Sequence, residues 1–182
     1  MNLPNKLTIL RVVMVPFFLA FFLIDRSGFQ LIALGIFILA SATDWLDGYL
    51  ARKNNQVTTF GKFMDPLADK MLTTAAFLGF LYYGYMNPWA LMIILAREFM
   101  VSGVRMAAAD KGHVIAASMW GKFKTVAQMV TIIISVILIA LPLLPEGMTH
   151  MVIALLIWVS TVLTLISGVD YLLKNRECLE IR

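Results

Sequence analysis

Four aspartates in one short stretch of the chain are the residues best suited to carry out chemistry. Asp44 and Asp47 are three positions apart, and Asp65 and Asp69 are four apart. On a helix, either spacing places both side chains on one face, about 5–6 Å apart between their Cβ atoms. Two such helices facing one another would gather four carboxylates, whose repulsion has to be offset by cations. Because these ligands are oxygens alone, we expect two divalent ions, Mg²⁺ or Mn²⁺, about 4 Å apart as in phosphoryl-transfer sites.

The residues between the aspartates suit a phosphate ligand. Gly48 and Gly61 remove side chains where a substrate would approach the backbone, and Ala51 leaves the helical face of Asp47 open. Arg52 supplies a fork of N–H donors that matches phosphate oxygens. This stretch therefore combines candidate metal ligands with candidate phosphate-binding positions.

Helix capping and solvation at a membrane surface are the alternative roles for these acids. Asp65 precedes Pro66, and a residue before proline disfavours the helical conformation, so Asp65 has a second interpretation as an N-cap with Pro66 at the first helical position. Capping does not account for four acids at two helical spacings. We therefore expect a functional site.

The rest of the chain has to hold this stretch within a membrane. Of 182 residues, 60% are hydrophobic and 14% are charged, a composition typical of an integral membrane protein, and we expect no nucleic-acid partner. Long uninterrupted apolar runs predict helices, since lipid offers backbone groups no hydrogen-bond partners. No small-residue cleavage site follows the first run, so we expect it to be retained. We predict an all-α fold, a single domain over 1–182 that forms a bundle of six transmembrane helices. The predicted spans are about Leu7–Ile24, Phe29 into the aspartate stretch, the end of the polar loop 51–59 to Tyr83, Trp89–Ala109, Thr125–Leu141 and His150–Leu173.

The lysines and arginines predict the orientation of the bundle. If both termini are cytoplasmic, every Lys and Arg except Arg26 lies on a cytoplasmic flank or in the cytoplasmic half of a span. The outside turns then hold Asp25, Arg26, Glu146, His150 and little else. The four aspartates would therefore face the cytoplasm.

The aspartate stretch resembles the signature of a known family, the CDP-alcohol phosphotransferases. The matching pattern is Asp44-x2-Asp47-Gly48-x2-Ala51-Arg52-x8-Gly61-x3-Asp65-x3-Asp69. Members of this family are membrane enzymes that move a phosphatidyl or phosphoalcohol group from a CDP-linked donor to an alcohol. The resemblance implies six spans, catalysis at the cytoplasmic face of a bacterial inner membrane, and homodimers. It also implies Asp44, Asp47 and Asp65 as metal ligands, Asp69 as both metal ligand and general base, and Gly48, Ala51, Arg52 and Gly61 as the CDP-donor site.

Cations outside this stretch indicate the acceptor. Four of them lie at the cytoplasmic ends of the fourth and fifth predicted spans, where they suit an acceptor that carries its own phosphate: Arg97, Arg105, Lys122 and Lys124. The segments NLPNKLTILR and GKFKT also resemble the glycerol-3-phosphate branch of the family, which implies that Asn5, Thr8 and Arg11 help to close the cytidine side. The predicted reaction transfers the phosphatidyl group of CDP-diacylglycerol to sn-glycerol 3-phosphate, giving phosphatidylglycerophosphate and CMP.

Several alternatives stay open at this point. The four cations, and Arg11, also fit the excess of positive charge on cytoplasmic flanks, and Glu98 fits a simple ion pair with a neighbouring cation. Within the enzyme class, the acceptor would instead be inositol phosphate, or phosphatidylglycerol as in cardiolipin synthesis. A different class is a small cation or proton transporter whose aspartates line an ion path. A transporter would be expected to show inverted repeats and acids spread across the membrane, and neither is visible in the sequence.

Overall fold

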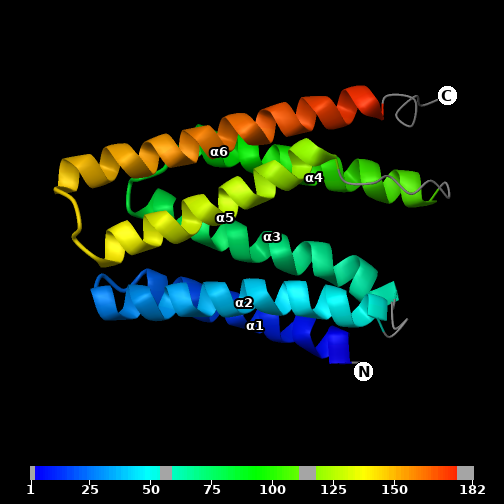
Figure 1. Cartoon of the computed structure of the whole chain (residues 1–182), viewed down its shortest axis with the longest axis horizontal. Helices are drawn as coiled ribbons and strands as arrows, with labels where there is room; N and C mark the ends of the chain where they lie inside the picture. Colours follow the sequence, from blue (N-terminus) through cyan, green and yellow to red (C-terminus); the bar gives the residue numbers. More distant parts are fainter. Residues whose placement is uncertain (1–2, 54–58, 111–117, 176–182) are drawn as a thin grey trace.

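The computed structural model describes residues 3–53, 59–110 and 118–175. For residues 3–4, 44–53, 59–63, 65–66, 69, 107 and 109–110 it describes the backbone alone. The described part of the chain contains six helices and no strand, which confirms the all-α prediction (Figure 1). The helices are α1 (Leu3–Phe22), α2 (Ser27–Lys53), α3 (Thr59–Tyr82), α4 (Pro88–Asp110), α5 (Met119–Ala140) and α6 (Glu146–Lys174).

The start of α5 differs from the predicted span. The helix begins at Met119 and not at Thr125, because Ser118 caps it: the Ser118 side chain accepts a hydrogen bond from the Gly121 N–H at 3.1 Å. Such a cap satisfies one of the N–H groups that a helix start leaves without partners. As a result, Lys122 belongs to the first turns of α5 and not to a loop.

The N-cap interpretation of Asp65 is wrong. The α3 helix already begins at Thr59 and continues through Pro66, so Asp65 lies inside the helix. A proline inside a helix removes one backbone hydrogen bond. In α3 the helix nevertheless continues through Pro66 to Tyr82, and it packs against α1.

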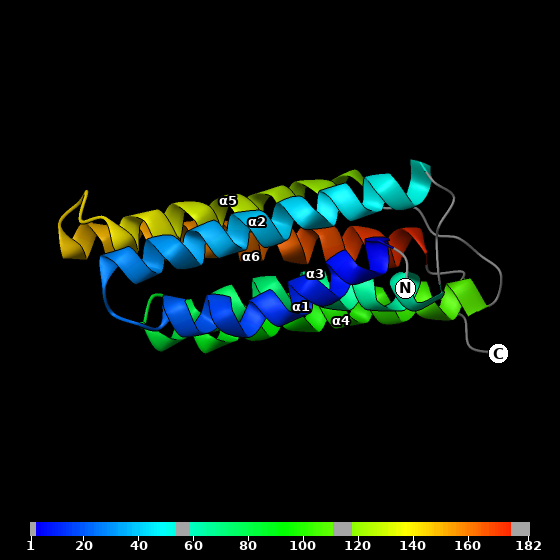
Figure 2. The ribbon, with the colours of Figure 1, turned by 90° about the horizontal axis from the view of Figure 1, so that it is seen from below.

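The six helices run up and down in an antiparallel bundle (Figures 1 and 2). The α1 helix packs against α2 and α3, α5 packs against α2 and α6, and α4 packs against α6. The start of α1, the end of α2, the start of α3 and the end of α6 all lie at the same end of the bundle. This arrangement brings the two halves of the aspartate stretch to one end of the molecule.

Aromatic side chains from α1, α2 and α3 form the centre of the core. Phe18, Phe22, Phe37 and Phe80 are fully buried, and the ring centroids of Phe22 and Phe80 lie 5.5 Å apart in an edge-to-face pair. Gly79 of α3 faces Phe22 so closely that a Cβ at Gly79 would overlap the ring. The glycine thus lets α3 approach α1, which fixes the helix that carries Asp65 and Asp69.

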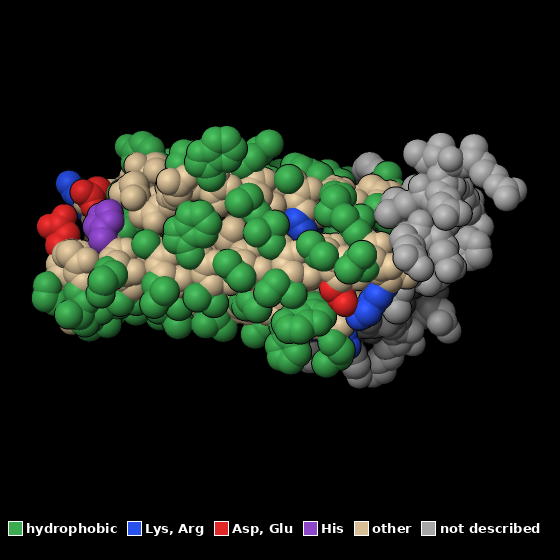
Figure 3. Space-filling view, turned by 90° about the horizontal axis from the view of Figure 1, so that it is seen from above, with side chains coloured by type: hydrophobic (Ala, Val, Ile, Leu, Met, Phe, Trp, Pro, Cys, Tyr) green, Lys and Arg blue, Asp and Glu red, His purple; other side chains and the backbone are tan. Residues whose placement is uncertain are grey.

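The outer surface of the bundle suits lipid. Three helices of the described chain are long and apolar enough to cross a membrane, over Asn5–Phe22, Met119–Ala140 and Glu146–Lys174, and a shorter apolar helical segment covers Ser27–Thr43. Figure 3 shows hydrophobic side chains over most of one flank, with acidic side chains and a histidine gathered at one end. The chain is therefore a multi-pass membrane protein, and the count of six spans stays a prediction.

Candidate active site

The backbone places the aspartates as two pairs on two consecutive helices. Asp44 and Asp47 lie in the C-terminal part of α2, and Asp65 and Asp69 lie in the N-terminal half of α3. Residues 54–58, which connect these helices, lie outside the described residues. The four aspartate side chains lie outside the description too, so their roles as metal ligands and base stay predictions.

The predicted CDP-donor positions fall on the same helices and on α1. Gly48, Ala51 and Arg52 follow the first aspartate pair in α2, and Gly61 precedes the second pair in α3. Their side-chain environment lies outside the description as well. Along the backbone, these predicted CDP-binding residues lie between the two pairs of aspartates.

On α1, the three predicted donor residues are all buried. Asn5, Thr8 and Arg11 are 8%, 1% and 0% exposed, and their spacing places them on one face of the helix. The Arg11 Nε donates to the carbonyl oxygen of Ala40, at 3.3 Å, one turn before Asp44 in α2. A fully buried arginine is rare and is retained where it has partners. An arginine that only marks the cytoplasmic flank of a membrane span would not need to be buried, so the burial of Arg11 favours a further role.

Arg97 of α4 is held in place by α6. Its Nη2 donates to Ser167 Oγ at 2.5 Å, and only 8% of the residue is exposed. A Cβ at Gly168 would lie 2.9 Å from the Arg97 Cγ, so the glycine leaves the space that the arginine stem occupies. Two neighbouring residues of α6 therefore fix the guanidinium and its stem.

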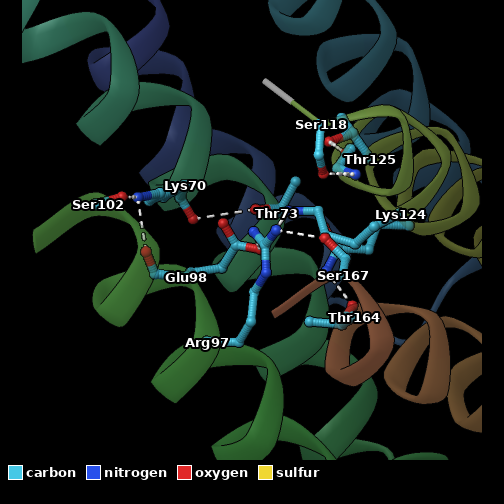
Figure 4. A network of polar contacts seen from close by, with 12 residues as sticks. Lys70, Thr73, Arg97, Glu98, Ser102, Ser118, Lys124, Thr125, Thr164 and Ser167 are labelled. Carbon is cyan, nitrogen blue, oxygen red and sulfur yellow. Dashed lines mark hydrogen bonds and ion pairs between the residues drawn. The ribbon is translucent and has the colours of Figure 1, made fainter. Parts of the chain in front are cut away.

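Glu98 brings two of the predicted acceptor cations together. Its Oε1 accepts from Arg97 Nη1 at 3.3 Å and also from Lys124 Nζ of α5 (Figure 4). The Glu98 side chain is 14% exposed and the Lys124 side chain 7%. The expected pairing of Glu98 with a neighbouring cation is thus confirmed, and it involves two cations.

Lys70 extends the network to α3. Its Nζ donates to the Glu98 carbonyl oxygen at 3.1 Å and to the Ser102 hydroxyl (Figure 4). Lys70 directly follows Asp69, the predicted base. The polar network therefore joins α3, α4, α5 and α6 next to one end of the aspartate stretch.

The other two predicted acceptor cations lie elsewhere on these helices. The Arg105 guanidinium carbon lies 5.7 Å from the centroid of the Tyr171 ring, a cation–π contact between α4 and α6. Lys122 is exposed on α5. The structure thus brings Arg97 and Lys124 together around Glu98 and places Arg105 against the aromatic face of Tyr171.

Several residues of this network were not predicted as site residues. Lys70 and Ser102 carry no distinctive sequence pattern beyond the position of Lys70 beside Asp69. Ser167 had a detectable signal, because α6 carries buried hydroxyl residues at helical spacing: Ser160, Thr164 and Ser167 are all 0% exposed. Tyr171, 2% exposed, continues this face one turn further.

The arrangement is suited to hold an anion beside a set of carboxylates. Arginine and lysine donors on α3, α4 and α5 converge in a largely buried setting, where charge-assisted hydrogen bonds are strong. No group of three or more His, Cys, Asp or Glu side chains that would hold a metal lies among the described side chains, which do not include the four aspartates.

Comparison with known proteins adds independent information. A family model described as CDP-alcohol phosphatidyltransferase matches residues 1–166. The chain is 41% identical to the CDP-diacylglycerol--glycerol-3-phosphate 3-phosphatidyltransferase of Bacillus subtilis (strain 168), with 98% of this chain and 97% of that protein covered. Proteins of the same name from Haemophilus influenzae and Rickettsia typhi are 38% and 36% identical, with 94% and 93% of this chain and 91% and 94% of those proteins covered. The similarity extends over nearly the whole length of all these proteins.

Proposed function

Because this chain belongs to the CDP-alcohol phosphatidyltransferase family, we propose that it transfers the phosphatidyl group of CDP-diacylglycerol to sn-glycerol 3-phosphate. The products are phosphatidylglycerophosphate and CMP. The observation that carries the choice of acceptor is the near full-length similarity to proteins named for this reaction. Membership of a family of transferases also argues against the cation-transporter alternative.

The four aspartates of the aspartate stretch offer the ligands that divalent metal ions would need in this reaction. Asp44 and Asp47 lie on one helix and Asp65 and Asp69 on the next, and all four offer only oxygen, which Mg²⁺ and Mn²⁺ prefer. These four residues would hold two ions. When bound, the ions supply neutralisation of the pyrophosphate charge and of the CMP leaving group.

Asp69 has the role of general base. It accepts the proton of the acceptor hydroxyl as the hydroxyl oxygen forms a bond to the phosphorus of the phosphatidyl group. The bond from that phosphorus to the CMP oxygen breaks, and CMP leaves with the bond electrons. The hydroxyl proton ends on the Asp69 carboxylate, so the step balances without a further reactant.

The donor site is formed by α1 together with the aspartate stretch. Gly48, Ala51, Arg52 and Gly61 hold the CDP moiety, and Asn5, Thr8 and Arg11 close its cytidine side. Support comes from the burial of the three α1 residues and from the hydrogen bond of Arg11 to α2 just before Asp44. The acyl chains of the donor remain in the bilayer.

The acceptor phosphate is bound by Arg97, Arg105, Lys122 and Lys124. One support is that Arg97 and Lys124 both contact the carboxylate of Glu98. Another is the hydrogen bond of Lys70 to the Glu98 carbonyl oxygen, which links Glu98 to the helix that carries Asp69. A phosphate in this position would lie beside the base. Cationic alcohols would be repelled by these donors, and neutral alcohols would form weaker hydrogen bonds with them than a phosphate does.

In the cell, the chain forms one domain over residues 1–182 with six spans in a bacterial inner membrane. Both termini and the active site face the cytoplasm, and two copies form a homodimer. Support for the orientation comes from the positive charge concentrated on one side of the spans. Further support is that the start of α1 and the end of α6 lie at the same end of the bundle (Figure 1).

Release of CMP by the purified full chain with CDP-diacylglycerol and Mg²⁺ or Mn²⁺ tests the proposal. We expect release with sn-glycerol 3-phosphate and none with inositol phosphate, serine or phosphatidylglycerol. Release with one of these instead would overturn the acceptor and leave the family intact. Asp69→Asn should abolish release while CDP-diacylglycerol binding persists, and an active variant would refute the role of Asp69 as base.

A further inference from the structure

One carboxylate occupies the place between the cations assigned to the acceptor phosphate. Oε1 of Glu98 accepts hydrogen bonds from both Arg97 and Lys124, which come from different helices (Figure 4). Its second oxygen accepts no hydrogen bond from any residue that the structure describes. The carboxylate is therefore bonded to both cations through a single atom.

The two sides of these ion pairs differ in how firmly they are held. Arg97 has a second anchor at Ser167, and Gly168 leaves room for its stem, so its position is set by α6 independently of Glu98. The carboxylate itself is 14% exposed and has no such second anchor among the described residues. Among the described contacts, the Glu98 carboxylate bonds to the two cations, whereas Arg97 keeps its hydrogen bond to Ser167 when Glu98 moves away.

A phosphate monoester competes well for these donors. It offers three acceptor oxygens and a charge of about −1.5 to −2 near neutral pH, compared with two oxygens and −1 for a carboxylate. Both groups bind arginine and lysine in the same manner, through charge-assisted hydrogen bonds. An entering phosphate can therefore take the two cations from Glu98.

We propose that Glu98 is a specificity-determining positioning residue that holds Arg97 and Lys124 until the phosphate of the acceptor displaces it. The inference rests on the proposed function, since it deepens the acceptor site assigned there. While Glu98 occupies the cations, the apparent affinity for any anion is reduced by the fraction of molecules in that state. Weakly charged ligands are thereby rejected, and a phosphorylated alcohol is accepted.

The substitution Glu98→Gln separates this role from a merely structural one, because the two predict opposite changes. The glutamine keeps the shape of the side chain but loses the charge that competes with phosphate. We expect inorganic phosphate, titrated calorimetrically into the purified full chain, to bind on the order of tenfold more tightly to the variant. The KM for glycerol 3-phosphate should fall similarly, while the KM for CDP-diacylglycerol stays unchanged.

Glu146→Gln is the matched control, because Glu146 is exposed at the start of α6, at the end of the bundle opposite the aspartate stretch (Figure 1). It should leave phosphate binding unchanged. Unchanged or weaker phosphate binding by folded Glu98→Gln would overturn the proposal. If that variant does not fold, Glu98→Asp provides the test. Its shorter carboxylate should also release the two cations and tighten the binding of phosphate. If neither variant folds, the carboxylate is a structural requirement and the proposal is wrong.

The experiment also separates this inference from the proposed function. If the wild-type chain releases CMP with a different phosphorylated acceptor, the glycerol 3-phosphate assignment fails while phosphate titration still tests Glu98. If CMP is released with glycerol 3-phosphate but the variant shows no gain in phosphate affinity, the Glu98 inference fails alone.

Discussion

Replacement of Gly168 by alanine should disturb the candidate acceptor site through a single methyl group. The new Cβ would lie 2.9 Å from the Arg97 Cγ and 3.9 Å from its Cβ. Carbon atoms pack best at about 3.5–4.0 Å, so the arginine stem has to move by roughly 0.5–1 Å. The contact is close to the backbone of α4, so the flexible end of the side chain cannot absorb the shift.

The expected energy follows from two opposing terms. Overpacking a buried position costs about 1–3 kcal/mol, whereas replacing a glycine inside a helix by alanine gains up to about 1 kcal/mol. Gly103→Ala on α4 is the matched control, because a Cβ added at Gly103 would meet no atom within 4 Å and only the gain in helix propensity applies. Gly168→Ala should thus be less stable than Gly103→Ala by about 1–3 kcal/mol.

Two assays read the two consequences. The free energy of unfolding, measured by SDS titration in mixed micelles, should show the stability difference between the two glycine variants. The KM for glycerol 3-phosphate should rise in Gly168→Ala by on the order of tenfold, since a displaced Arg97 loses hydrogen bonds to Ser167 and Glu98. The KM for CDP-diacylglycerol should not change.

A double-mutant cycle gives the result that would refute this reasoning. Arg97→Ala removes the Cγ that the new methyl group would meet. In that background, Gly168→Ala should cost no more than Gly103→Ala does. If its cost is the same with and without the arginine stem, the clash is not with Arg97 and the site is packed differently.

Two further predictions concern aromatic contacts. Tyr171→Leu should raise the KM for glycerol 3-phosphate about two- to fivefold, because the cation–π contact of an exposed Arg105 is worth about 0.5–1 kcal/mol. Tyr171→Phe keeps the ring and should change this KM little. Equal effects of the two variants would contradict a role for the ring. Gly79→Ala should lower the free energy of unfolding by about 1–3 kcal/mol, because the added Cβ would overlap the buried Phe22 ring. An unchanged midpoint of thermal unfolding would show that α1 and α3 are not in such close contact.

The helices of this protein were largely predictable because their apolar runs are long and their breaks are polar. The fourth predicted span, Trp89–Ala109, differs from α4 by one residue at each end. The errors occurred where polar residues lie inside a helix. Hydropathy placed Lys122 and Lys124 before the fifth span, but capping by Ser118 includes them in α5.

The aspartate stretch was recognisable because its chemistry is encoded by spacing along one chain segment. The network around Glu98 was not, since contacts among α3, α4, α5 and α6 depend on how each helix is rotated in the bundle. Sequence spacing does not determine that rotation. The convergence of Arg97 and Lys124 was anticipated in outline, but the shared carboxylate and the anchor at Ser167 required the structure.

The contacts of Lys70 have a thermodynamic consequence for the two substrates. This side chain fastens α3, at the residue next to Asp69, to the backbone of Glu98 and to Ser102 on α4. A ligand that shifts α4 at Glu98 therefore alters the energy of α3 at Asp69. Such coupling is reciprocal, so any factor by which CDP-diacylglycerol changes the affinity for glycerol 3-phosphate must equal the factor for the reverse effect. The order in which the two substrates bind would then be a matter of rates and concentrations, with the same ternary complex reached by either route.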